Sequence, residues 1–402
     1  MNILVISYCF LPWLAPRSIQ ESRILGAIAD KGNKVTIVQR TLDKLDVPLD
    51  YELSGLVHPA ISTIEIEEPT ATGWRVAKRV FPPLGNMPDP ANIWAIGAAK
   101  KALSLIHDHS VLITFSTPVS DHLAGLIVKR KNRSMPWAVF FSDPFVQNPY
   151  ISMSPIERSL NAHLERSIME HADAVIFVNG VTRDRTMIGY PSLWYKKTHV
   201  IPHAFDDALY PKKEQSRDKR LTIRYMGDFY GRRTPESLFK ALRVVSNTSR
   251  EFIVEIYGQI DDDMKSLITR YGLDEMVKPR GRISYLKNLS LMRTSDVLLT
   301  IDAPGTTSLF LPSKLIDYLG AGRPILAITS PVGPTADIVR EMGSQPLGHD
   351  DTQGIADRIL SYIVQKAKGR LEMTVPEEVL NRYRAQNVGS RYMKVLEGIV
   401  NL

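Results

Sequence analysis

The sequence predicts an α/β protein made of two domains, each built around a doubly wound parallel sheet. Three observations support this prediction. The chain has 402 residues, which is too long for one ordinary hydrophobic core. Strand–loop–helix–strand patterns, the units from which such sheets are built, occur in both halves of the chain. The stretch 211–220 between them is nearly all polar and charged, as expected of a linker between domains.

The first pattern opens the chain. Residues 2–7 read as an apolar strand, 8–18 as a loop with two prolines, and 19–28 as a helix. Gly32 ends this helix pattern before a second apolar strand at 35–38. Because ligands bind beyond the carboxyl ends of strands in such sheets, we expect the loop to face a ligand-binding crevice.

The second half of the chain repeats the pattern most clearly near its middle. An apolar strand at 297–301 is followed by a polar loop and a short helix that should start near Pro312, because proline suits the first helical position. Gly322 ends this helix, and a second strand follows at 325–328. The connection is expected to be right-handed.

The start of this short helix is a candidate anion site. We expect the backbone N–H groups of Ser313, Lys314 and Leu315 to lack partners within the helix, and Lys314 adds a positive charge. Asp317 lies on the helix face shared with Ser313. A cation and free amides suit a phosphate, and a carboxylate nearby suits hydroxyl groups, so the combination suits a nucleotide sugar. The alternative is an ordinary βαβ unit whose Lys314 and Asp317 are solvated.

This helix carries a recognisable motif. Asp317, Tyr318, Gly322 and Pro324 occupy the defined positions of a Glu-Ala-x-x-x-Gly-x-Pro pattern, with the glycine and the proline identical. The chain thereby resembles the retaining glycosyltransferases of the GT-B fold (family 4-like, group 1 type), and the resemblance extends from the first residue to about Glu341. Asp317 is shorter than the glutamate of the pattern but keeps its carboxylate.

The resemblance implies an architecture. It is that of two Rossmann-like domains facing a cleft, with the acceptor bound by residues 1–210 and the nucleotide sugar by residues 218–385. A C-terminal helix, residues 386–402, is expected to return to the first domain. The resemblance departs at Leu309, which stands where the family has its first glutamate.

The loop that follows the strand 222–226 is a second candidate phosphate site. It runs from Gly227 to Arg233, and the family has a lysine at the position of Arg233. A guanidinium can donate two parallel hydrogen bonds to a phosphate. The family's arginine directly after the glycine is Asp228 here, and we expect Arg232 or Arg17 to replace its charge.

Two sites in the first domain follow from the resemblance. Arg17 and Ser18 stand where the family has a loop against the donor diphosphate, although they also fit a surface loop before a helix. Asp143 follows the strand 138–141 and is expected to orient or deprotonate the acceptor hydroxyl. The alternative is a helix N-cap at Ser142 or Asp143.

The expected catalytic residues are Asp143, Arg233 and Lys314. The expected donor-binding residues are Arg17, Ser18, Gly227, Arg232, Arg233, Gly258, Ile283, Ser313, Lys314, Leu315 and Asp317.

The predicted reaction is retaining transfer of a sugar from a nucleotide-diphosphate sugar to a hydroxyl of a saccharide or lipid-linked saccharide, in cell-surface polysaccharide or glycoconjugate synthesis. No metal or other cofactor is expected, and Asp261–Asp263 are interpreted as acids that favour a helix start. Two alternatives remain: a nucleotide-sugar epimerase of the same fold, and a non-catalytic nucleotide-sugar-binding protein. Leu309 and Asp228 keep the second alternative open.

Composition predicts a cytoplasmic protein. The chain has one cysteine, no run of about 18 apolar residues and no signal-peptide pattern at its start. Most of the net charge of +7 lies after Tyr210, which agrees with an anionic donor, and no nucleic acid partner is expected. Two basic clusters beside apolar residues predict peripheral binding to an anionic inner membrane face, with ordinary solvated surface as the alternative. These clusters are Arg75, Lys78 and Arg79 within Trp74–Phe81, and Lys129, Arg130, Lys131 and Arg133 within His122–Trp137.

Overall fold

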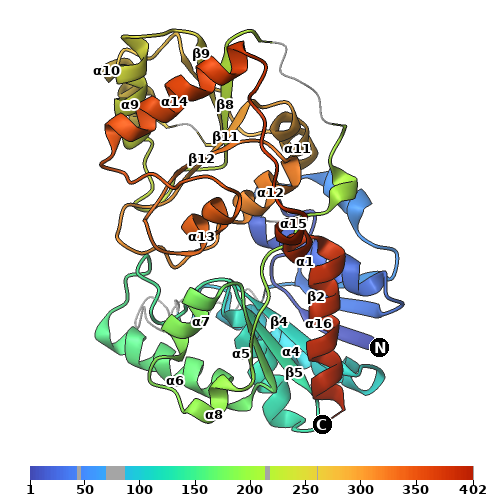
Figure 1. Ribbon diagram of the computed structural model, residues 1–402. Coiled ribbons are helices and arrows are strands. Elements are labelled where there is room, and N and C mark those ends of the chain that lie inside the picture. The colour runs from blue at the N-terminus through green and yellow to red at the C-terminus, as the bar shows by residue number, and fades with distance from the viewer. Residues whose placement is uncertain (43–46, 69–86, 213–217, 260, 402) are drawn as a thin grey trace. The chain divides into compact units, whose positions relative to one another are not determined.

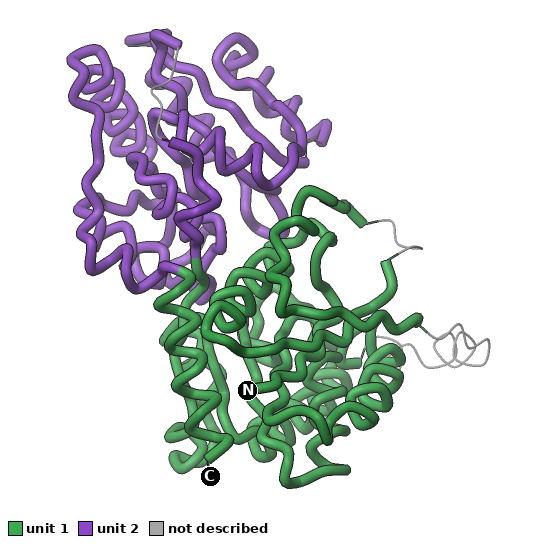
Figure 2. Tube along the Cα trace, turned by 90° about the vertical axis from the view of Figure 1, so that its right-hand side faces the viewer, with its two compact units in different colours: residues 1–204, 385–402 green, residues 205–384 purple. Residues whose placement is uncertain are grey.

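The computed structural model describes residues 1–42, 47–68, 87–212, 218–259 and 261–401. The chain divides into two compact units, one made of residues 1–204 and 385–402 and the other of residues 205–384 (Figure 2). Each unit contains one parallel sheet with helices, which confirms the predicted α/β fold with two Rossmann-like domains (Figure 1). The basic cluster predicted at Trp74–Phe81 lies outside the described residues, as does part of the predicted linker.

The first unit is built on a seven-stranded sheet. Its strands are β1 (Asn2–Ile6), β2 (Lys34–Arg40), β3 (Ile61–Ile66), β4 (Val111–Ser116), β5 (Trp137–Phe141), β6 (Ala174–Phe177) and β7 (Thr198–Val200). Their order in the sheet is β3-β2-β1-β4-β5-β6-β7, and all neighbours are parallel. The order therefore reverses between β1 and β4, where Ile3 pairs with Val35 on one side and Val111 on the other.

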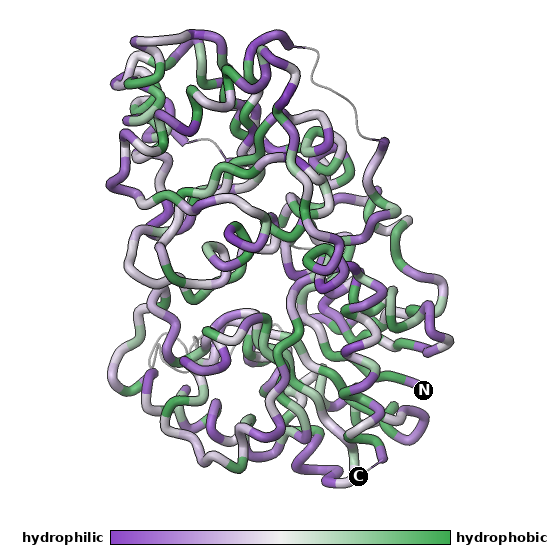
Figure 3. Tube along the Cα trace, in the orientation of Figure 1, coloured by the Kyte–Doolittle hydropathy of each residue, from purple (hydrophilic) through white to green (hydrophobic). Residues whose placement is uncertain are grey.

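The helices of the first unit complete its core. They are α1 (Pro16–Ala29), α4 (Asn92–Leu105), α5 (Ser120–Lys131), α6 (Pro155–His171), α7 (Gly180–Met187), α8 (Ser192–Tyr195) and α16 (Ala385–Val400), with 3-10 turns at Tyr51–Leu56 and Ile106–Asp108. Alternate strand residues such as Leu4 and Ile6 are fully buried in one core with residues of α4, α5 and α6. Figure 3 shows hydrophobic and hydrophilic stretches alternating along the chain in both units.

The C-terminal helix α16 packs against α1. The two helices approach closely at Gly389, where an added Cβ atom would lie 2.7 Å from the Cβ of Ala27. Glycine at this position therefore permits the contact between the last helix and the first.

The second unit is built on a five-stranded sheet. Its strands are β8 (Leu221–Met226), β9 (Phe252–Tyr257), β10 (Val277–Pro279), β11 (Val297–Ile301) and β12 (Ile325–Ile328). Its helices are α9 (Glu236–Ser246), α10 (Asp262–Arg270), α11 (Tyr285–Arg293), α12 (Ser313–Ala321), α13 (Pro334–Glu341), α14 (Thr352–Ala367) and α15 (Glu377–Tyr383), with a 3-10 turn at Asp207–Leu209. The strand order is β10-β9-β8-β11-β12, so it reverses between β8 and β11. The predicted unit of β11, α12 and β12 is present. Helix α12 ends at Ala321, and the next residue, Gly322, has a left-handed φ of +64°.

The apolar residues of the second basic cluster are core residues, which corrects one premise of the membrane prediction. Trp137 and His122 are fully buried, and Lys129 forms an ion pair with Asp173 at 2.7 Å. Lys131 and Arg133 are exposed. In the described part of the chain, no helix combines the length and apolar content needed to cross a membrane.

Candidate functional site

The candidate site of the second unit lies where its strand order reverses, at the carboxyl ends of β8 and β11 and the start of α12 (Figure 1). In doubly wound sheets this switch point is the place where ligands bind. Gly227 directly follows β8, and Lys314 is the second residue of α12. The fold therefore brings two predicted site residues, 87 positions apart, to one place.

Lys314 is held against Tyr225. Its Nζ donates to the Tyr225 hydroxyl at 2.8 Å and lies 4.0 Å from the centre of the ring. A Cβ atom at Gly227, whose φ is +129°, would lie only 2.8 Å from this Nζ. A Cβ atom at Gly258 would collide with the backbone carbonyl of Gly227. Both predicted glycines thus leave room for the lysine and for the loops that surround it.

Arg233 approaches the same place from the loop that follows β8. Its side chain is 7% exposed, stacks on Tyr230 at 4.9 Å, and has its Nη2 3.8 Å from Oδ1 of Asp302. Asp302 directly follows β11, and its Oδ2 accepts a hydrogen bond from the Thr329 hydroxyl at 2.7 Å. Asp302 and Thr329 were not predicted as site residues; the position of Asp302 at a strand's carboxyl end was the signal that would have found it.

The electrostatics of this place favour an anion. Burial, and next the charge of Arg233, hold the pKa of Lys314 well below its usual range. Burial also opposes the charge of Arg233, but Tyr230, Tyr225 and Asp302 outweigh it and raise the pKa of Arg233. Two basic groups therefore share a small, poorly hydrated space, and an anion bound between them would relieve their repulsion.

The negative charge of Asp228 would repel an anion at this site, but Asp228 is paired with Arg282. Burial raises its pKa, but hydrogen bonds from Arg282 and from the backbone N–H of Gln259 outweigh this and lower it. The Arg282–Asp228 ion pair has an N···O distance of 2.6 Å. Arg282 therefore neutralises Asp228. The sequence predicted that Arg232 or Arg17 replaces the positive charge missing at this position; Arg232 is exposed.

Asp317 lies one turn after Lys314, as predicted. It is 6% exposed, and its Oδ1 accepts from the Tyr285 hydroxyl at 3.1 Å. The backbone N–H of Leu315 donates to the carbonyl of Pro312 at 3.0 Å, so the prediction that this amide is free is wrong. Ile283 lies in the loop before Tyr285 and is half-buried.

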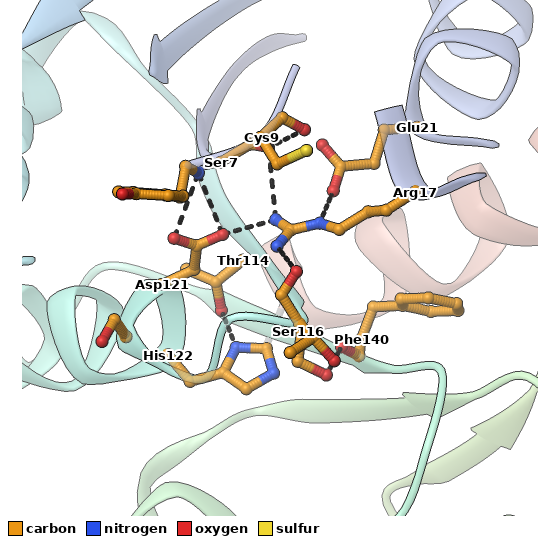
Figure 4. A network of polar contacts seen from close by, with 12 residues as sticks. Ser7, Cys9, Arg17, Glu21, Thr114, Ser116, Asp121, His122 and Phe140 are labelled. Carbon is orange, nitrogen blue, oxygen red and sulfur yellow. Dashed lines mark hydrogen bonds and ion pairs between the residues drawn. The ribbon is translucent and has the colours of Figure 1, made fainter. Parts of the chain in front are cut away.

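The two predicted donor-binding residues of the first unit, Arg17 and Ser18, make polar contacts inside that unit, and Figure 4 shows the network around Arg17. The guanidinium of Arg17 forms ion pairs with Glu21 and Asp121. The hydroxyl of Ser18 lies 3.1 Å from Sγ of Cys9 and is fully buried. The donors of Arg17 thus face acceptors of its own unit, with Ser7 Oγ at 3.2 Å and the Thr117 carbonyl among them.

Asp143 follows β5 and is half-buried. Its Oδ2 accepts from the hydroxyl of Ser142 at 3.2 Å. The interpretation of these two residues as a helix N-cap is wrong, because the next helix begins at Pro155 and is capped by Ser154. The predicted role of Asp143 toward an acceptor hydroxyl stays a prediction.

Two doubly wound units, with the last helix returning to the first unit, define a protein of the GT-B fold. No family model matches the chain, and no curated protein does. Solved structures match it along its whole length. A glycosyltransferase from Rickettsia africae is 13% identical, with a TM-score of 0.67, and the match covers 99% of this chain and 98% of that one. Sucrose-phosphate synthase from Thermosynechococcus elongatus is 17% identical, with a TM-score of 0.70 and coverage of 100% and 99%. A putative UDP-N-acetylglucosamine 2-epimerase from Listeria monocytogenes is 12% identical, with a TM-score of 0.62 and coverage of 99% and 96%. This likeness establishes the fold.

Proposed function

We propose that the protein is a glycosyltransferase that moves a sugar from a nucleoside-diphosphate sugar to a hydroxyl group. The observation that carries the proposal is the pair of basic side chains, Arg233 and Lys314, gathered at the switch point of the second unit. A diphosphate between them supplies the negative charge that the pair lacks. It also raises the pKa of Lys314 again, because an adjacent anion favours the ammonium form.

The chemistry follows from charge. When the bond to the sugar breaks, negative charge develops on the departing diphosphate, and Arg233, Lys314 and the N-terminus of α12 stabilise it. One such contact is worth about 2.7–4 kcal/mol of barrier. Because these groups do the work of a divalent cation, we propose that the reaction needs no metal. Asp317, held by Tyr285, accepts hydrogen bonds from the ribose hydroxyls.

The finer assignments rest on the motif of α12. Retention at the anomeric carbon follows from the resemblance of Asp317–Pro324 to retaining enzymes. We propose a saccharide or lipid-linked saccharide as acceptor, with Asp143 orienting or deprotonating its hydroxyl, and a role in cell-surface polysaccharide or glycoconjugate synthesis in the cytoplasm. Peripheral membrane binding now depends on the cluster at 74–81 and on exposed charges such as Lys131. Sedimentation with anionic vesicles at low and high salt tests it.

The test of the proposed function is a panel of UDP-, GDP-, ADP- and TDP-sugars, each incubated with the protein and followed by proton and phosphorus NMR. Slow release of nucleoside diphosphate and of free sugar with its original anomeric configuration supports a retaining transferase. Initial rates that persist in excess EDTA support metal independence. The variants Arg233→Ala and Lys314→Ala are assayed in parallel, and each should lower the rate at least about 100-fold.

The same panel separates the two alternatives. The Listeria structure shares the fold, so formation of an epimeric nucleotide sugar without net hydrolysis would favour the epimerase. Tight binding of a nucleotide sugar with no turnover would favour the non-catalytic protein. Absence of both binding and turnover across the panel would overturn the proposal.

A further inference from the structure

Asp302 makes an unusual ion pair with Arg233. Its side chain is 3% exposed, and one carboxylate oxygen, Oδ2, is fixed by the hydroxyl of Thr329. The other oxygen, Oδ1, faces Arg233 at 3.8 Å, which is longer than a hydrogen bond. In the part of the chain that the structure describes, neither this Oδ1 nor the Nε of Arg233 has a hydrogen-bond partner.

This arrangement is costly for the protein alone. A buried carboxylate oxygen and a buried guanidinium N–H each lose their hydration, and a short two-bond contact between them would offset the loss. Thr329 binds Oδ2, and Oδ1 lies 3.8 Å from Nη2 of Arg233, a distance at which the charges attract without a hydrogen bond. Arg233 is therefore attracted to Asp302 by charge, while its buried Nε keeps a donor that no described residue accepts.

We propose that Asp302, fixed by Thr329, is a positioning residue that aims the guanidinium of Arg233 at a diphosphate bound at the start of α12. The inference rests on the proposed function, because it assumes a diphosphate at this place. Asp302 acts through Arg233 and touches no substrate. It also offsets part of the repulsion between Arg233 and Lys314 before the ligand arrives.

Two substitutions separate charge from shape. Asp302→Asn keeps the size of the side chain and an oxygen for the Thr329 hydroxyl, but removes the charge. Thr329→Val keeps the shape and removes the hydrogen bond, whereas Thr329→Ser restores a hydroxyl. We expect the first two variants to weaken nucleoside-diphosphate affinity at least about tenfold, and Thr329→Ser to stay near the wild type.

A double-mutant cycle distinguishes positioning from general stability. In an Arg233→Ala background, Asp302→Asn should no longer weaken affinity about tenfold, because there is no guanidinium left to orient. The matched control is Asp296→Asn. Asp296 is also an ion-paired aspartate, half-buried, but it precedes β11 at the opposite end of the strand, where it binds Lys366 and the backbone N–H of Thr222. Its variant should lower the melting temperature without changing affinity.

Affinities are measured by titration calorimetry with inorganic pyrophosphate and with UDP, GDP, ADP and TDP, and folding by circular dichroism. If the wild type binds and Asp302→Asn loses affinity equally with and without Arg233, positioning is overturned while the proposed function stands. Unchanged affinity in Asp302→Asn and Thr329→Val overturns it too. If Asp302→Asn does not fold, Thr329→Val and Thr329→Ser decide. If the wild type binds neither pyrophosphate nor any nucleotide, the inference and the proposed function fall together.

Discussion

Replacing Gly227 by alanine tests whether the space around Lys314 is part of the site. The added Cβ atom would lie 2.8 Å from Nζ and 3.2 Å from Cε of Lys314, whereas ordinary contact begins at 3.4 Å. The amine must therefore retreat by about 0.6 Å, which lengthens its 2.8 Å hydrogen bond to Tyr225. At the φ of +129° an alanine also adds strain of about 1–3 kcal/mol.

Two effects should follow from Gly227→Ala, and they are separable. A displaced charge-assisted contact costs about 1.5–3 kcal/mol, so the dissociation constant of a nucleoside diphosphate should rise roughly 10- to 100-fold. The strain should lower the melting temperature. The matched control is Gly343→Ala, at a φ of +74° with no atom within 4 Å of the added Cβ. It is strained as well but lies far from Lys314 in the sequence and should bind like the wild type.

Titration calorimetry gives the affinities, and circular dichroism gives the melting temperatures. Equal affinity in Gly227→Ala and Gly343→Ala, with Gly227→Ala folded, would refute the reasoning that the amine of Lys314 must stay where the structure has it.

Two further predictions concern carboxylates with different roles. Asp317→Asn should weaken binding of nucleoside diphosphates but not of their 2′,3′-dideoxy analogues, because it removes the ribose acceptor; equal loss for both ligands, measured by calorimetry, would contradict this role. Burial raises the pKa of Glu165 to about 7. The pKa of a glutamate in an unfolded chain is about 4.3. Between about pH 4.3 and about 7 the folded state holds a proton that the unfolded state has lost. Glu165 therefore makes the free energy of unfolding fall as pH rises, by at most about 1.4 kcal/mol per pH unit. Glu165→Gln cannot titrate at this position. From pH 5 to pH 7 the free energy of unfolding of the wild type should therefore fall relative to that of the variant. All five tryptophans fall within residues 1–204, so urea unfolding followed by tryptophan fluorescence reports on the first unit. If the free energies of unfolding of wild type and variant change with pH in the same way, the raised pKa of Glu165 is contradicted.

The fold could be predicted from patterns of neighbouring residues in the sequence. Apolar runs bounded by proline and glycine placed the strands on either side of α12, and its start and end follow from Pro312 and Gly322. Such signals act over a few residues, and therefore a single sequence displays them. The GT-B architecture then followed from two such sheets and the motif at Asp317.

The site depended on contacts that local pattern does not contain. Arg17 looked free in a loop, but its partner Asp121 is 104 positions away. Asp228 looked like a lost positive charge, but Arg282, 54 positions later, neutralises it. Trp137 stood beside basic residues in the sequence, yet the fold buries it in the core. In each case the prediction used only the residues adjacent in the sequence, whereas a residue distant in the sequence determines the environment of the side chain.

The central claim is that Arg233 and Lys314 together bind a diphosphate. The most direct measurement is the affinity of wild type, Arg233→Ala, Lys314→Ala and the double variant for a nucleoside diphosphate and for the matching monophosphate, by titration calorimetry. The wild type should prefer the diphosphate, each single variant should lose about tenfold or more of that preference, and the double variant should show none. A wild type that binds both nucleotides equally, or variants that keep the preference, would contradict the account.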